Sequence, residues 1–73
     1  MSFREDLQKI ANVRHISFDA VVEEAVREAS GNNEDHVRLF TKPALRIIQS
    51  SFEPPEFIRS YLINHPSISE PAS

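Results

Sequence analysis

The sequence predicts an all-α protein, a small bundle of four to five short helices with a disordered C-terminal tail. Three observations support this fold class. Apolar residues recur with the 3.6-residue period of a helix in separate segments, capping residues stand before the expected helix starts, and no segment shows a β-hairpin signal. With 73 residues the chain has room for one domain, which we place at residues 1–65, followed by a flexible tail at residues 66–73.

The first helix is expected at about residues 3–12. Ser2 and Glu5 have the spacing of a capping box, in which the serine hydroxyl accepts a hydrogen bond from the first turn and the glutamate reaches back to the serine amide. The apolar stripe that follows has helical spacing. It consists of Phe3, Leu7, Ile10 and Ala11.

The second helix is expected to begin after Ser17 and to stop at Gly31. Ile16 precedes the capping serine and can pack over Val21 as a hydrophobic staple. Gly31 is the one glycine of the chain, and it can take the left-handed conformation that ends many helices. The apolar stripe keeps the helical period over three turns. It consists of Phe18, Val21, Val22, Ala25, Val26 and Ala29.

A third helix is expected from about Glu34, after two asparagines that can cap it. Pro43 leaves two outcomes open. Either a short helix at residues 34–41 breaks and Thr41 caps a new one that starts at Lys42 or Pro43, or one long helix kinks there. The capping threonine favours the break. The residues expected to face inward here are Val37, Phe40, Leu45, Ile48 and Phe52.

The last helix is expected from about Pro55 to Asn64. Two consecutive prolines cannot lie inside a helix, but the second suits the first helical position, and Pro66 prevents continuation. The apolar stripe of this segment consists of Phe57, Ile58, Tyr61 and Leu62.

Composition narrows the range of functions. Eight Lys and Arg against eleven Asp and Glu give a net charge of −3, the wrong sign for a protein that binds by neutralising phosphates. Cysteine is absent, which excludes disulfides, thiolate nucleophiles and cysteine-based zinc or iron–sulfur sites. No apolar run indicates a signal peptide or a membrane span, so we expect an intracellular protein, cytoplasmic by default.

No constellation of residues predicts catalysis or a bound metal. The histidines stand in three different connections or helix ends, each without a second His or acid at i+3 or i+4 on its own helix. They are His15, His36 and His65. Glu23, Glu24 and Glu28 resemble paired acids, but no matching His motif occurs, and we interpret them as a solvated acidic face. We therefore expect a non-enzymatic protein with no cofactor, no metal and no small-molecule substrate.

Charge is unevenly distributed along the chain. Residues 1–35 hold eight acids against four bases, and residues 36–65 hold two acids against four bases. Arg38, Lys42 and Arg46 form a basic ridge if the backbone stays helical through the proline. The ridge has three interpretations: it pairs with the acidic second helix within one chain or across a dimer, it is merely solvated, or it contacts phosphates.

A surplus of apolar residues is the best functional clue. Leu39, Ile47 and Ile63 lie beside the inward stripes and widen them beyond what one thin core covers. Short helices buried on broad arcs would hide them. We favour the alternative, in which the C-terminal helices expose a patch that another chain covers. The predicted partner-binding residues are Leu39, Ile47, Phe57, Arg59, Tyr61 and Ile63.

The sequence thus predicts a small regulatory or accessory protein that binds a protein partner and self-associates, as a dimer. One core of this size supplies only about 3–5 kcal/mol, which is a further reason to expect association. The alternative is a nucleic-acid-binding regulator, also dimeric, that uses Arg38, Lys42 and Arg46.

Overall fold

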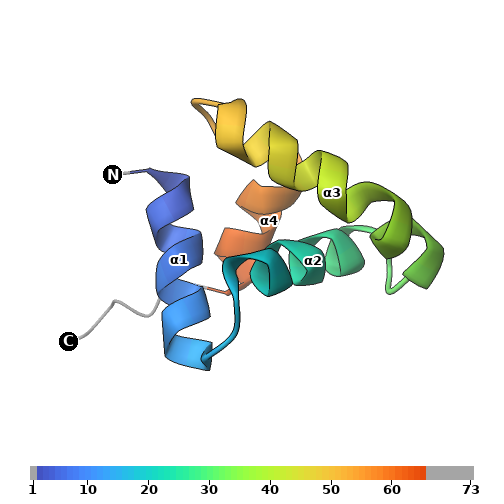
Figure 1. Cartoon of the computed structure of the whole chain (residues 1–73), viewed down its shortest axis with the longest axis horizontal. Coiled ribbons are helices and arrows are strands. Elements are labelled where there is room, and N and C mark those ends of the chain that lie inside the picture. The colour runs from blue at the N-terminus through green and yellow to red at the C-terminus, as the bar shows by residue number, and fades with distance from the viewer. Residues whose placement is uncertain (1, 66–73) are drawn as a thin grey trace.

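The computed structural model describes residues 2–65 and confirms the all-α fold class. Four helices and no strand are found in these residues (Figure 1). The helices are α1 (Phe3–Arg14), α2 (Phe18–Ala29), α3 (Glu34–Ser50) and α4 (Glu56–Asn64). The predicted tail at residues 66–73 lies outside the described residues.

Helix α2 is the centre of the fold, because it packs against each of the other three helices. In Figure 1, α1 stands at one side of α2, α3 runs above it, and α4 lies between α1 and α3. All four helices contribute to one apolar core. Its buried residues are Phe3, Leu7, Ile10, Ala11, Val21, Val22, Ala25, Val26, Val37, Ala44, Ile48, Ile58 and Tyr61.

The first three helices are capped at their N-termini by side chains. The hydroxyl of Ser2 accepts a hydrogen bond from the backbone N–H of Glu5, and that of Ser17 accepts one from Ala20. The side chain of Asn33 accepts from two backbone N–H groups in the first turn of α3. These bonds satisfy amides that have no partner within the helix, so the predicted starts of the first three helices are confirmed.

Helices α1 and α2 both end in a left-handed residue. Gly31 has φ 68°, as predicted, while α1 runs past its predicted end and closes on His15, with φ 59°. The backbone N–H of Ile16 reaches back to the carbonyl of Ala11 at 3.0 Å, and the equivalent bond after α2 is 2.8 Å. Both ends are Schellman motifs. For a residue other than glycine, the left-handed conformation costs about 1–2 kcal/mol, so His15 carries strain that Gly31 avoids.

The predicted break at Pro43 is wrong, because α3 is continuous from Glu34 to Ser50. Thr41 does not cap a new helix. Its hydroxyl donates instead to the carbonyl of Val37, one turn earlier, at 2.6 Å. Pro43 has no backbone N–H to donate to the carbonyl of Leu39. Leu39 lies on the exposed side of α3, where water can satisfy this carbonyl.

Burial on both sides of Pro43 explains why the helix does not break. Val37 comes before the proline, Ala44 and Ile48 come after it, and all three are buried on one face of α3. A proline inside a helix costs about 3 kcal/mol. Burying a Val or Ile side chain contributes about 1.5–3 kcal/mol, so a break that moved both Val37 and Ile48 out of the core would cost at least as much as the strain it relieves.

Three of the residues predicted to face inward are exposed. Phe40 keeps 49% of its surface accessible, since in a continuous helix it stands at the border of the face that carries Val37. Phe52 is 99% exposed, because α3 ends at Ser50 and the helical period no longer applies. Ala29, in the last turn of α2, is also exposed.

Candidate functional site

The outer side of α3 exposes large apolar side chains. Leu39, Phe40 and Ile47 are 66%, 49% and 47% exposed. Phe40 and Ile47 are separated by two helical turns and share one side of the helix, and Pro43 lies between them. We call Leu39, Phe40, Pro43 and Ile47 the α3 apolar face. It lies beside the buried face of the same helix.

Part of the α3 apolar face borders an open groove of about 540 Å³. The end of α2, the middle of α3 and the start of α4 form the groove. Its lining residues are Val26, Ala29, Ser30, His36, Phe40, Pro43, Ala44, Ile47 and Phe57. The half-buried ring of Phe57 packs against the core and joins α4 to this surface. The groove is therefore mainly apolar and is built on three rigid elements.

The structure brings together some of the predicted partner-binding residues. Ile47 and Phe57 line the same groove, and Leu39 lies beside it on α3. Arg59 and Ile63 are exposed one turn apart on α4, but neither is among the residues that line the groove. The predicted exposure of Leu39, Ile47 and Ile63 is confirmed.

Tyr61 does not lie on the exposed surface, which corrects the prediction that it borders the contact patch. It is 1% exposed, because it stands one turn after Ile58 on the buried side of α4. Its hydroxyl donates to Oε1 of Glu24 at 3.1 Å and accepts from Nη1 of Arg14 at 3.3 Å. Tyr61 thus joins the core to a polar cluster.

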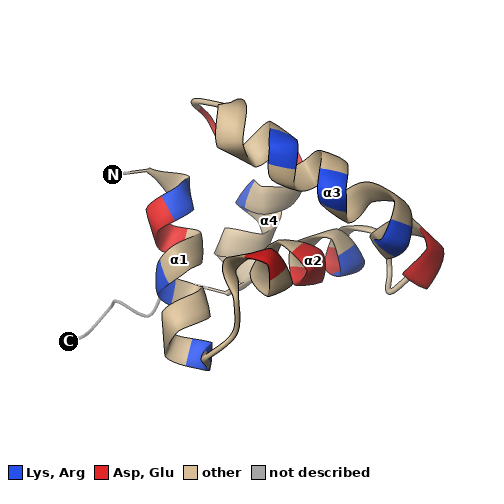
Figure 2. Cartoon of the chain, in the orientation of Figure 1, with Lys and Arg blue, Asp and Glu red and all other residues tan. Residues whose placement is uncertain are grey.

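The basic ridge is intact because α3 is continuous. Arg38, Lys42 and Arg46 are all exposed, and within residues 2–65 no ion pair joins them to an acid. Arg38 and Lys42 line a shallow hollow with Glu23 and Glu34, but both acids pair with an arginine of α2. The intramolecular pairing that was one interpretation of the ridge is not found in this part of the chain. Figure 2 shows basic residues along α3 and acidic residues on α1 and α2.

The ridge adjoins the α3 apolar face. Lys42 follows Leu39, and Arg46 follows Pro43, by three residues each, so each cation is a neighbour of an apolar residue on the helix surface. The outer side of α3 therefore presents an apolar strip with a positive border. A complementary surface has an apolar strip with a negative border.

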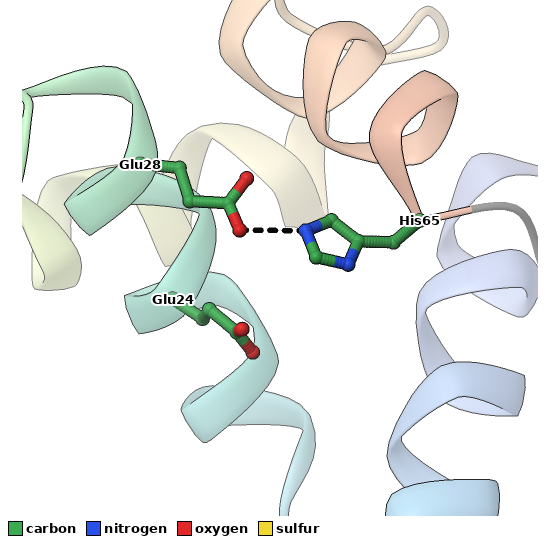
Figure 3. Close-up of side chains that lie close together, drawn as sticks. All are labelled: Glu24, Glu28 and His65. Carbon is green, nitrogen blue, oxygen red and sulfur yellow. Dashed lines mark hydrogen bonds and ion pairs between the residues drawn. The ribbon is translucent and has the colours of Figure 1, made fainter.

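A second group of side chains lies where the end of α4 meets α2 (Figure 3). Nε2 of His65 is 2.6 Å from Oε2 of Glu28. Glu24, one turn earlier on α2, pairs with Arg14 at 2.5 Å and accepts from Tyr61. The ring of Tyr61 stacks on that of His65, with 4.3 Å between the centroids. We call Glu24, Glu28 and His65 the acid–histidine cluster.

Sequence reasoning missed this cluster. The spacing of Glu24 and Glu28 places both acids on one side of α2, but spacing within a single helix does not indicate a partner on another helix. His65 is 37 residues from Glu28 and stands at the end of α4, so only the packing of α4 against α2 brings the two together. The interpretation of Glu23, Glu24 and Glu28 as merely solvated is therefore wrong, because each of them has a side-chain partner within residues 2–65.

The polar environment of Tyr61 changes its acidity. Burial disfavours the phenolate, and the negative charge of Glu24 together with its hydrogen bond to the hydroxyl has the same effect. The opposing effect of Arg14 is smaller, and the pKa of Tyr61 rises to about 12. At neutral pH the phenol is thus a fixed hydrogen-bond donor to Glu24.

No match is found in comparisons with protein-family models, with curated proteins and with solved structures. Among residues 2–65, no helix has both the length and the apolar character needed to cross a bilayer.

Proposed function

We propose that this chain is a non-enzymatic protein-interaction module, a small regulatory or accessory protein whose docking surface is the α3 apolar face. The observation that supports the proposal most directly is the exposure of Leu39, Phe40 and Ile47 on one helix. A contiguous apolar patch of this kind is typical of surfaces that another chain covers. Each Å² of apolar surface removed from water contributes about 25 cal/mol to association.

The proposed occupant is an amphipathic helix of a protein partner, with an apolar stripe bordered by Asp or Glu. Charge complementarity supports this choice, since Lys42 and Arg46 border the α3 apolar face and have no acidic partner within residues 2–65. The 17 residues of α3 make a surface about 25 Å long, enough for several turns of a partner helix. The charges set the orientation and speed the encounter more than they add affinity.

A second copy of the chain is the alternative occupant. The acids on α1 and α2 of one copy can face the basic ridge of another, which supplies the charge pairing that the ridge lacks within its own chain (Figure 2). Light scattering on the purified protein separates the two cases. A dimer that Ile47→Asp dissociates means that a second copy occupies the α3 apolar face, and a monomer leaves this face open for a partner.

Two synthetic helical peptides test the partner chemistry. Both have the same leucine stripe, and it is bordered by Glu in one and by Lys in the other. We expect the Lys-bordered peptide to bind at least tenfold more weakly in fluorescence anisotropy, because it places like charges against the positive border of α3. Arg46→Glu should remove or reverse this preference. Equal binding of the two peptides contradicts the proposed partner.

Substitutions test the location of the surface. Ile47→Asp and Leu39→Asp should abolish peptide binding or dimerisation while leaving the helical circular dichroism intact, because both residues are already exposed. Val13→Asp is the matched control, since Val13 is 60% exposed on α1. If Val13→Asp weakens association as much as Ile47→Asp does, the α3 apolar face is not the docking surface.

Binding to nucleic acid is the second candidate function. The continuity of α3 favours it, because Arg38, Lys42 and Arg46 are held in line and exposed. Binding to a duplex must then weaken steeply with salt, with a slope that falls by about one for each cation removed. Salt-independent binding, or the absence of binding at low salt, eliminates this candidate.

A further inference from the structure

We propose that the acid–histidine cluster binds a divalent transition-metal ion such as Zn²⁺ or Ni²⁺. Glu24, Glu28 and His65 each offer one ligand atom, and these atoms all lie within 4.8 Å of one another. Around a tetrahedral ion with bonds of about 2.0–2.2 Å, ligand atoms stand roughly 3.5 Å apart. Rotation of the two carboxylate side chains is the adjustment that would bring the ligand atoms to this spacing.

The donor set selects the class of metal. One imidazole nitrogen and two carboxylate oxygens are a set that zinc, nickel and copper accept. Calcium and magnesium are coordinated by oxygen and take six or more ligands, which this cluster does not supply. The side chains of Glu24, Glu28 and His65 keep 27%, 35% and 34% of their surface exposed, so an ion can enter and water can fill the remaining position.

The ligands are held on two packed helices. Glu24 and Glu28 are one turn apart on α2 and share a side of that helix. The ring of His65 is oriented by stacking on Tyr61, and the backbone N–H of His65 donates to the carbonyl of Tyr61 at 2.8 Å. Figure 3 shows Glu28 and His65 pointing toward each other, with Glu24 below them on α2. The metal would replace the present contact between Glu28 and His65.

Arg14 and Tyr61 are the residues that position Glu24. Both bond to Oε1 of the carboxylate, and within the described residues no hydrogen bond engages Oε2. Ligating carboxylates in metal sites are commonly held in this way by outer hydrogen bonds. Oε2 of Glu24 is thus the oxygen assigned to the metal.

Titration of the untagged full chain with Ni²⁺ tests the proposal. Tyr61 is the single tyrosine, and the chain has no tryptophan, so its fluorescence reports events at the adjacent His65. We expect saturable quenching with one ion per chain, and the same stoichiometry by calorimetry. The absence of saturable binding at millimolar Ni²⁺ overturns the proposal.

Four variants locate the site. His65→Ala and Glu28→Gln should each weaken Ni²⁺ binding at least tenfold. Glutamine has nearly the same shape as glutamate, so Glu28→Gln still tests the site if His65→Ala does not fold. His36→Ala and Glu23→Gln are the matched controls on other parts of the surface and should bind as the original chain does. Equal losses in the controls, or full binding by Glu28→Gln, assign the ion to scattered surface groups and overturn the proposal.

Discussion

Nη1 of Arg4 donates to the backbone carbonyl of Ile48 at 2.5 Å, and to that of Ser51 at 2.9 Å. The last turn of α3 has no basic residue of its own. Arg4, at the start of α1, therefore provides both the positive charge and the hydrogen bonds that the C-terminal carbonyls of α3 need. This interaction joins α1 to α3 through two residues, Arg4 and Ile48, that are 44 positions apart in sequence.

Replacing Arg4 by methionine should lower the free energy of unfolding by about 1–2 kcal/mol, because partly buried carbonyls lose a charged donor. Urea denaturation followed by circular dichroism measures the change. Lys9→Met is the control, since Lys9 is exposed on the same helix. Equal effects of the two substitutions would show that the contact does not stabilise α3.

Substitutions of His15 and Gly31, the left-handed residues after α1 and α2, should have opposite effects on stability. His15→Gly should raise the free energy of unfolding by up to about 1 kcal/mol, because glycine takes φ 59° without strain. Gly31→Ala should lower it by about 1 kcal/mol. Beyond residue 31 and its two chain neighbours, no heavy atom lies within 4 Å of the added Cβ, so the loss is conformational. Thermal denaturation measures both, and effects of the same sign would contradict the two left-handed ends.

Ultraviolet titration should show that Tyr61 ionises late. The pKa is raised from its ordinary value of 10.0 to about 12, and Tyr61 is the single tyrosine, so the tyrosinate signal belongs to it alone. Glu24→Gln should shift the transition to lower pH, because a negative charge that opposes the phenolate is removed. Glu23→Gln should leave it in place. A normal pKa in the folded chain contradicts the buried position of Tyr61.

The raised pKa of Tyr61 also makes the free energy of unfolding depend on pH in the alkaline range. Below pH 10 both the folded and the unfolded chain keep the phenolic proton, and the contribution of Tyr61 is fully present. Between pH 10 and about 12 the unfolded chain loses this proton while the folded chain retains it, so the free energy of unfolding falls as pH rises. In Tyr61→Phe this part of the fall should be absent when urea denaturation is compared at pH 9 and pH 11.

Pro43→Ala should stabilise the chain by about 1–3 kcal/mol, because alanine restores the amide that can bond to the carbonyl of Leu39 within a continuous helix. Pro54→Ala, in the loop before α4, has no helical bond to restore and should change stability little. If the helical circular dichroism of Pro43→Ala exceeds that of the original chain by the signal of more than one helical residue, α3 is broken at Pro43 in solution.

Most of the secondary structure follows from local signals in the sequence. Ser2, Ser17 and Gly31 act on backbone groups a few residues away, so their effects can be predicted from spacing alone. Pro43 is different. Its own chemistry favours a break, and what keeps α3 continuous is the burial of Val37 and Ile48 against other helices, which local patterns do not contain.

The candidate sites show the same division. The exposure of Ile47 could be predicted because it lies off the buried stripe of its own helix. For Tyr61 the helical spacing from Ile58 correctly predicts a place in the apolar stripe, whereas the frequency of tyrosine at contact surfaces wrongly predicts a place in the docking patch. The contact between His65 and Glu28 depends on how two helices pack, so no spacing within either helix could indicate it.

The central place of α2 has a consequence for how the molecule opens. Helices α1, α3 and α4 all pack against α2. If α1 or α4 detaches transiently, α2 is therefore still covered by the other two helices. Amide protons of Val22 and Ala25 should therefore be the slowest in the chain to exchange for deuterium, and those of α1 and α4 should exchange sooner.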